Sequence, residues 1–308
     1  MRKILVLVLA LSAVAVNTSC KKEINKIGNT VLKSNLSDAN AIIDFNNNFL
    51  DSYKSSTDNI ESILKYSQAA ETKAKGGRVL IMPMVINIRD FNISKIKEIP
   101  SGFGKDKNAI EKDFNTYKAK IESIRKKSEE LKSYINAEDY KDDSGAKAER
   151  LNKEIEAEAQ AFYIVGESII TKIKPATDLA EEEILKDHPM KKYIISSKGI
   201  INLLDSTMEI LEKQYTGGFN ESVAKNKYDE LEKAVGNNEK LDFNVTDSQY
   251  SSKKTQFESV NTKARNFLDN YRKLIRNSKE TGTISDGDIR SLDSSYESVL
   301  SSYNSFVK

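Results

Sequence analysis

The most constraining feature of the sequence is a run of apolar side chains whose spacing alternates between four and three residues. This alternation places one side chain per turn on a single face of an α-helix, and it is typical of helices that pack lengthwise against one another. The run comprises Ile110, Phe114, Tyr117, Ile121, Ile124, Ser128, Leu131 and Ile135. It predicts a long helix whose apolar stripe must be covered by other helices.

An antiparallel helix pair is predicted on either side of a polar turn at residues 136–144. The helix after the turn has its own stripe, from Ala148 to Ile173. Pro175 is expected to end this helix, because proline removes a backbone donor and clashes with the preceding turn. Asp178 and Glu181 have the spacing of a capping box, so they predict a new helix start.

Stripes of helical period account for most of the remaining chain. They lie at residues 42–64, 194–215, 223–235, 250–274 and 289–306. Charged residues make up 31% of the chain and there are only four prolines, a composition that favours helices over a sandwich or barrel. We therefore predict an all-α fold over residues 37–308: an elongated bundle of about seven or eight amphipathic helices with coiled-coil-like antiparallel hairpins.

The start of the chain has the pattern of an export signal that ends at Cys20. A basic start, Met1-Arg2-Lys3, precedes an apolar run from Ile4 to Val16 that is too short to span a bilayer. The small residues Thr18 and Ser19 then precede the single cysteine of the chain. This arrangement resembles the bacterial lipobox, although Asn17 stands where that pattern commonly has an aliphatic residue.

The lipobox resemblance implies cleavage before Cys20 and acylation of its thiol and new amine, with diacylglyceryl and palmitate-type chains. Residues 1–19 are then a signal peptide, and residues 20–36, which lack a clean period, are expected to be a flexible tether. The alternative is an ordinary secretory signal with Cys20 left as a free thiol. One cysteine also means that no disulfide supports the fold.

An unusual apolar segment extends from Val79 to Ile88 and contains Pro83. The proline excludes a regular helix and the segment is too short for a membrane span. We expect an extended connection packed over the bundle. Contact with an apolar partner, or a ligand pocket between helices near residues 79–88, is the alternative, since exposed apolar patches seldom occur without a use.

Few residue patterns in this chain point to catalysis, metal binding or cofactor binding. The single histidine, His188, lies in an Asp-His-Pro helix break, where a capping role is the ordinary explanation. Residues 181–183 are three consecutive glutamates, which point around a helix and cannot converge on one ion. Residues 101–105 lack phosphate-loop spacing, and Asp139, Asp142 and Asp143 lack calcium-loop spacing. We predict no catalytic, cofactor or metal residues, and no enzyme activity.

Charge and tyrosine content bear on the partners of the chain. The net charge of +2 falls to zero once Arg2 and Lys3 leave with the signal, which argues against nucleic-acid binding. Six of the thirteen tyrosines recur on the apolar stripes. We expect them to pack in the core, and a groove of tyrosine hydroxyls for a sugar or peptide is the alternative.

Two short segments resemble the YiiG-type family of bacterial lipoproteins, which have an all-helical domain of unknown function. One is the turn at residues 139–143, Asp-Tyr-Lys-Asp-Asp, with its flanking helices, and the other is the Phe45–Tyr53 segment. The resemblance covers roughly Leu36 to Tyr303. It implies a lipoprotein without assigned catalytic residues.

Together these features predict a non-enzymatic lipoprotein of the cell envelope. The lipid bilayer is its expected partner through acylated Cys20, and the helical domain is expected to bind another envelope protein or an envelope polymer. We expect it on the outer membrane, facing the periplasm or the cell surface.

Overall fold

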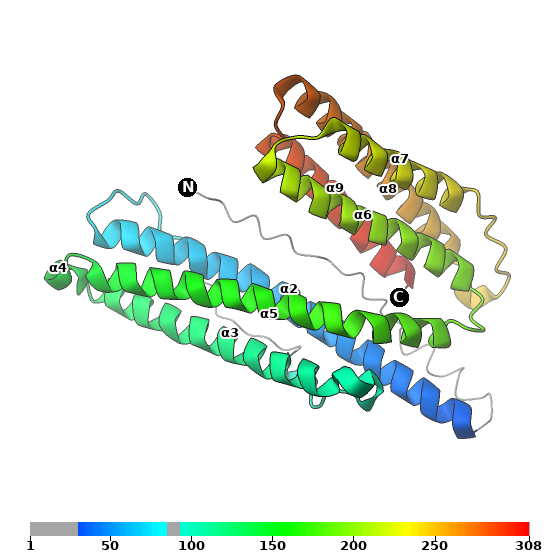
Figure 1. The fold of residues 1–308 in the computed structure, drawn as a ribbon, viewed down its shortest axis with the longest axis horizontal. Coiled ribbons are helices and arrows are strands. Elements are labelled where there is room, and N and C mark those ends of the chain that lie inside the picture. Colours follow the sequence, from blue (N-terminus) through cyan, green and yellow to red (C-terminus); the bar gives the residue numbers. More distant parts are fainter. Residues whose placement is uncertain (1–29, 85–92, 308) are drawn as a thin grey trace. The chain divides into compact units, whose positions relative to one another are not determined.

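The all-α prediction is confirmed by the structure, a computed structural model that describes residues 30–84 and 93–307 (Figure 1). Within these ranges there are eight α-helices and no strand. The helices are α2 (Thr30–Ala74), α3 (Lys107–Asn136), α4 (Tyr140–Asp143), α5 (Ala146–Ile184), α6 (Lys191–Gly217), α7 (Glu221–Glu239), α8 (Lys253–Thr281) and α9 (Asp286–Val307).

The predicted helical range, residues 37–308, contains two compact units, and the chain passes from one to the other within α5. The N-terminal unit comprises Ser34–Ala180 and the C-terminal unit is centred on Glu181–Lys308.

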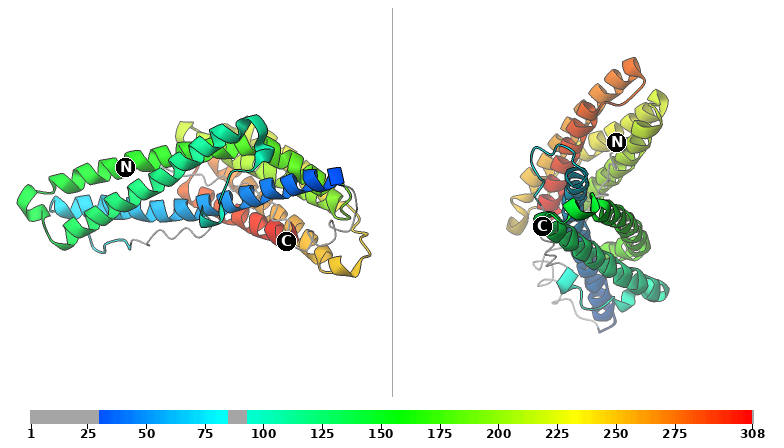
Figure 2. Two further views of the ribbon diagram at one scale, coloured as in Figure 1. Left: turned by 90° about the horizontal axis from the view of Figure 1, so that it is seen from below. Right: turned by 90° about the vertical axis from the view of Figure 1, so that its left-hand side faces the viewer.

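In the N-terminal unit, helices α2, α3 and α5 lie side by side (Figures 1 and 2). The stripe of α3 is buried along its whole predicted length. Aromatic rings of α2 pack against rings of the other two helices, in the pairs Phe45–Phe114, Phe49–Tyr117 and Tyr53–Phe162. Cross-helix ion pairs run antiparallel between α3 and α5, from Lys127–Glu154 (2.7 Å) to Lys120–Glu158 (2.8 Å). The predicted antiparallel pair is confirmed.

The segment after α2 returns to the beginning of that helix. Its 3-10 helix, Ser101–Asp106, places Phe103 edge-on against Phe45, with ring centroids 5.3 Å apart. Gly102 lies so close to Ile42 that a Cβ atom there would come within 2.7 Å of the Ile42 side chain. Residues 101–105 therefore have a packing role at the start of α3.

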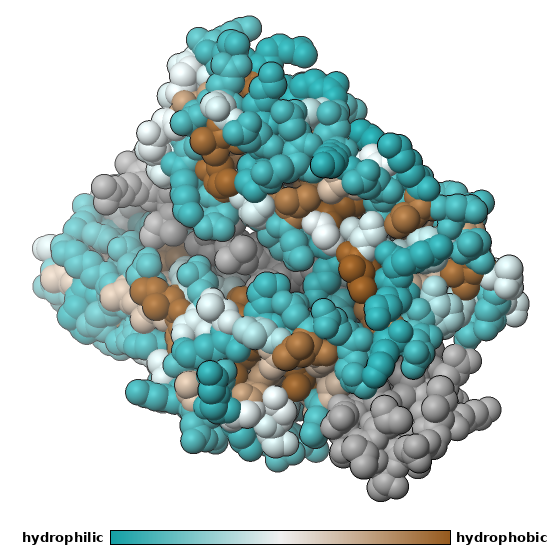
Figure 3. All heavy atoms as spheres, turned by 45° about the vertical axis from the view of Figure 1, so that its right-hand side comes forward, coloured by the Kyte–Doolittle hydropathy of each residue, from teal (hydrophilic) through white to brown (hydrophobic). Residues whose placement is uncertain are grey.

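The C-terminal unit is an antiparallel four-helix bundle. Pairs between neighbouring helices show the order: Tyr228 of α7 with Arg272 of α8, Ser259 of α8 with Ser302 of α9, and Asp205 of α6 with Tyr296 of α9. Its core is built from the predicted stripes of all four helices, from Leu185 to Phe306. On the face drawn in Figure 3, hydrophilic residues predominate and hydrophobic ones form small separate groups.

Two predicted helix starts are wrong. Helix α2 begins at Thr30, so residues 30–36 are not part of a tether. No proline or glycine interrupts residues 30–74, and extending an existing helix adds a hydrogen bond for each residue fixed. Helix α5 continues through Pro175 to Ile184, and the hydroxyl of Thr177 donates to the Ile173 carbonyl (3.0 Å) as it does inside a helix.

Candidate functional site

Cys20, the predicted lipidation site, lies outside the described residues, as do the signal peptide at residues 1–19 and the tether up to residue 29. No helix in the part of the chain that the structure describes has the length and apolarity needed to cross a membrane.

The most exposed apolar side chains of the structure lie in the segment Arg78–Met84, which we call the α2 exit loop. Leu80, Ile81 and Met84 are 80%, 85% and 84% exposed, whereas the other large exposed hydrophobic side chains lie between 39% and 68%. The expectation that this segment packs over the bundle is wrong for these three side chains. The remaining predicted residues of the segment, 85–88, lie outside the described residues.

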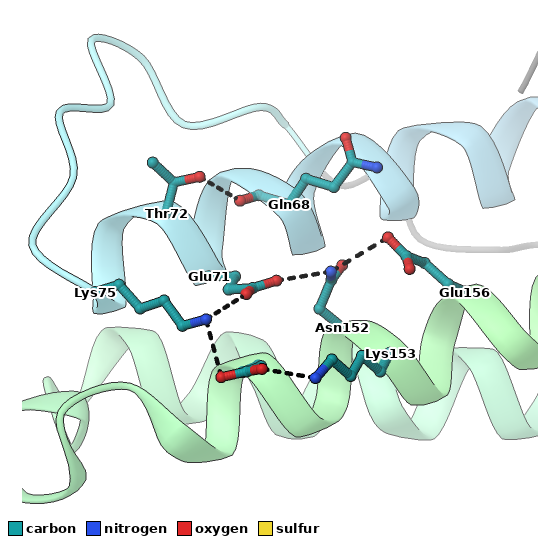
Figure 4. A network of polar contacts seen from close by, with 8 residues as sticks. Gln68, Glu71, Thr72, Lys75, Asn152, Lys153 and Glu156 are labelled. Atoms are coloured by element: carbon teal, nitrogen blue, oxygen red, sulfur yellow. Dashed lines mark hydrogen bonds and ion pairs between the residues drawn. The ribbon is translucent and has the colours of Figure 1, made fainter. Parts of the chain in front are cut away.

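A network of polar contacts holds the end of α2 against α5 directly before the exit loop (Figure 4). Lys75 pairs with Glu71 (2.8 Å) and with Glu149 at the start of α5 (2.9 Å). The amide of Asn152 donates to the Glu71 carboxylate (2.8 Å). Lys153 and Lys75 together lower the pKa of Glu149 to about 2. The loop therefore emerges from an anchored helix end, where Gly76 turns the chain with a φ of +78°.

Acidic side chains of the neighbouring α3–α5 turn form hydrogen bonds and ion pairs within the turn. Tyr134 donates to the Asp143 carboxylate, which also accepts from the backbone N–H groups of Gly145 (2.9 Å) and Lys147 (3.0 Å). The hydrogen bond from Tyr134 lowers the pKa of Asp143. In the same turn, Lys141 forms an ion pair with Glu138. Asp143 thus satisfies the free N–H groups at the start of α5. The four-residue helix α4 lies within this predicted turn.

The glutamate run at residues 181–183 diverges around α5. Glu181 is 4% exposed and pairs with Lys198 of α6, while Glu182 is exposed. Sequence reasoning missed this buried pair, because the partner lies on another helix and a glutamate early in a predicted helix has the pattern of a cap. Among the described residues, no group of three His, Cys, Asp or Glu side chains is arranged to hold a metal ion.

His188 lies between α5 and α6, at the predicted break. Its Nδ1 atom accepts from the backbone N–H of Met190 (3.1 Å), the residue directly before α6, and so stabilises the turn between the two helices. The imidazole ring packs edge-on against Tyr250, with ring centroids 5.6 Å apart.

The stripe tyrosines pack in the two cores, as predicted. Tyr117, Tyr271 and Tyr303 are fully buried. The Tyr117 hydroxyl shares a hydrogen bond with Ser52 (3.0 Å), and the Tyr271 hydroxyl donates to the Ala224 carbonyl (2.8 Å). The hydroxyls of Tyr117 and Tyr271 thus form hydrogen bonds within the protein, which disfavours the alternative of a tyrosine-lined groove at these two positions.

Comparison with solved structures agrees with the all-helical fold. An alpha helical protein from Bacteroides fragilis is similar over 87% of this chain and 98% of its own, at 19% identity and a TM-score of 0.55. An uncharacterized DUF3829-like protein from Bacteroides thetaiotaomicron is similar over 87% of this chain and 99% of its own, at 18% identity and a TM-score of 0.52.

No curated protein matches the chain. The model of the protein family of unknown function DUF3829 matches residues 39–308, which include nearly all of both helical units. The chain belongs to the DUF3829 family.

Proposed function

We propose that this DUF3829 protein is a cell-envelope lipoprotein, of the YiiG type, whose helical units bind another envelope protein or an envelope polymer. The observation that carries the proposal is the N-terminal pattern of basic start, short apolar run and Ser19-Cys20. Because each buried methylene of an acyl chain contributes about 0.8 kcal/mol, two or three chains on Cys20 hold the protein firmly on the bilayer.

A non-enzymatic role is supported by the contacts of the potentially reactive side chains, which bind other groups of the protein. His188 stabilises the turn before α6, Glu181 is buried against Lys198, and Asp143 caps α5. These groups stabilise local structure. Outer-membrane attachment, with the units facing the periplasm or the cell surface, completes the proposal.

Replacing the anchor residue tests the proposal. The Cys20→Ser variant should leave the membrane fraction and lose labelling by an alkyne-bearing palmitate analogue. Ser19→Ala is the matched control, because it keeps a small residue before the cysteine and should be labelled like the unmodified chain. Unchanged membrane retention of Cys20→Ser, or unlabelled wild-type protein, contradicts the anchor. Protease treatment of intact cells then distinguishes a surface location from a periplasmic one.

A further inference from the structure

The α2 exit loop presents three long aliphatic side chains to solvent at one end of the N-terminal unit. Leu80, Ile81 and Met84 lie within five consecutive residues, and each is at least 80% exposed. Keeping such side chains in water forgoes the burial free energy that drives folding and association, and clusters of this kind mark surfaces for proteins or membranes.

The charge around these side chains fits an anionic lipid surface. Between Thr72 and Met84 the chain carries Lys73, Lys75 and Arg78 and no acid. Lys75 forms ion pairs with Glu71 and Glu149. Arg78, which directly precedes the apolar segment, is exposed and pairs with no acid among the described residues. Aliphatic side chains with adjacent basic ones are the combination that binds a bilayer surface.

Two of the four acids in the neighbouring α3–α5 turn, Glu138 and Asp143, are compensated within the unit. Glu138 pairs with Lys141, and Asp143 is held by Tyr134 and by backbone N–H groups. The α3–α5 turn therefore opposes contact with anionic headgroups less than its composition implies.

We propose that the α2 exit loop inserts Leu80, Ile81 and Met84 into the bilayer that holds the chain. This inference rests on the proposed lipid anchor for its orientation. Helix α2 has 45 residues, so its two ends are on the order of 67 Å apart. Cys20 precedes Thr30 by ten residues, which reach at most about 35 Å. With the anchor before one end and the loop after the other, α2 lies along the membrane surface.

A tryptophan reporter tests insertion directly, because the chain contains no tryptophan. The lipidated full-length Ile81→Trp variant is reconstituted in vesicles of phosphatidylethanolamine and phosphatidylglycerol, with and without phosphatidylcholine carrying brominated acyl chains. Its emission should shift to shorter wavelength and be quenched by the brominated lipid. Leu179→Trp is the matched control, since Leu179 of α5 is also exposed (68%), and it should show neither effect.

Partition of the chain of residues 20–308 with Cys20→Ser, which lacks both the apolar signal and the acylated thiol, onto the same vesicles gives a second measurement. Replacing Leu80, Ile81 and Met84 together by serine should lower the partition coefficient at least ~100-fold, since each buried aliphatic side chain contributes roughly tenfold. The control pair Ile164→Ser and Leu179→Ser should leave it unchanged. Arg78→Gln should lower it about fivefold on anionic vesicles and not on pure phosphatidylcholine.

The possible outcomes distinguish a failure of loop insertion from a failure of the lipid anchor. A solvent-exposed, unquenched indole in the Ile81→Trp variant, on vesicles that retain the lipidated chain, overturns loop insertion and leaves the anchor standing. Vesicle binding by the non-lipidated chain, lost in the triple serine variant, supports the loop even if Cys20 proves unmodified. Shielding of the same indole without vesicles, or by a protein in intact cells only, assigns the loop to a protein contact and overturns the inference.

Discussion

Gly166 of α5 lies directly against the Tyr53 ring of α2. A Cβ atom at Gly166 would come within 2.2 Å of the Tyr53 ring, which is itself buried against Phe162. Gly199 of α6 offers the opposite environment, since it is exposed and its added Cβ would meet no atom within 4 Å. Glycine is therefore required for packing in α5, whereas in α6 it only increases the conformational freedom of the unfolded chain.

These two glycines give a matched pair of substitutions. Gly166→Ala should lower the free energy of unfolding by about 1–3 kcal/mol, because the Tyr53 ring must move in a packed core. Gly199→Ala should raise it by about 0.5–1 kcal/mol, because alanine restricts the unfolded chain without a clash. Urea unfolding followed by circular dichroism measures both. Equal effects of the two substitutions would contradict the packing argument.

At the scale of elements, tertiary contacts extend helices past local stop signals. Helix α5 passes through Pro175 because Ile173 before it and Ala180 and Ile184 after it are all buried. Their burial outweighs the roughly 3 kcal/mol that a proline costs inside a helix. Helix α7 likewise continues through Gly236 to Glu239, and Asn238 in its last turn is fully buried.

The buried amide of Asn238 links three helices of the C-terminal unit. It donates to the Asn261 side chain of α8 (2.7 Å) and to the Ser197 hydroxyl of α6 (3.4 Å). A buried polar pair of this kind favours one register of the helices, since any shift leaves the amides unsatisfied.

Substitution of the two asparagines tests this coupling. Asn261→Leu should lower the free energy of unfolding by about 1–3 kcal/mol, because the Asn238 amide loses its nearest acceptor in the core. Adding Asn238→Leu should recover most of that loss, since both partners are then apolar. Urea unfolding of the two single variants and the double variant gives the coupling energy. Additive losses would show that the amides act independently.

At the scale of the whole molecule, the C-terminal unit carries a complete core of its own. All the residues of its buried cluster lie between Leu185 and Phe306. Its only buried charged side chain, among the described residues, is Glu181, whose partner Lys198 belongs to the same unit.

A fragment of residues 181–308 should therefore fold without the rest of the chain. We expect a helical circular-dichroism spectrum and a single cooperative thermal transition. Phe267→Ala in the fragment, at a fully buried position, should lower the free energy of unfolding by about 3–5 kcal/mol and serves as the control for a packed core. A broad transition that does not respond to Phe267→Ala would mean that the unit depends on the N-terminal residues.

The candidate site was partly predictable from the sequence. The run from Val79 to Ile88 is recognisable as apolar, broken by Pro83 and too short to span a bilayer. Its exposure was not predictable, because an apolar segment has the same composition whether it packs on a helix or extends into solvent. The expected packing of Leu80, Ile81 and Met84 was wrong for this reason.

The helical class and the inward face of nearly every helix could be predicted from the sequence, because both depend on spacing within a few turns of chain. Only the tertiary structure decided that there are two cores, that α5 continues through Pro175 and that Glu181 is buried against Lys198. These outcomes depend on which surfaces meet, and contacts between residues far apart in the chain leave no local periodic signal.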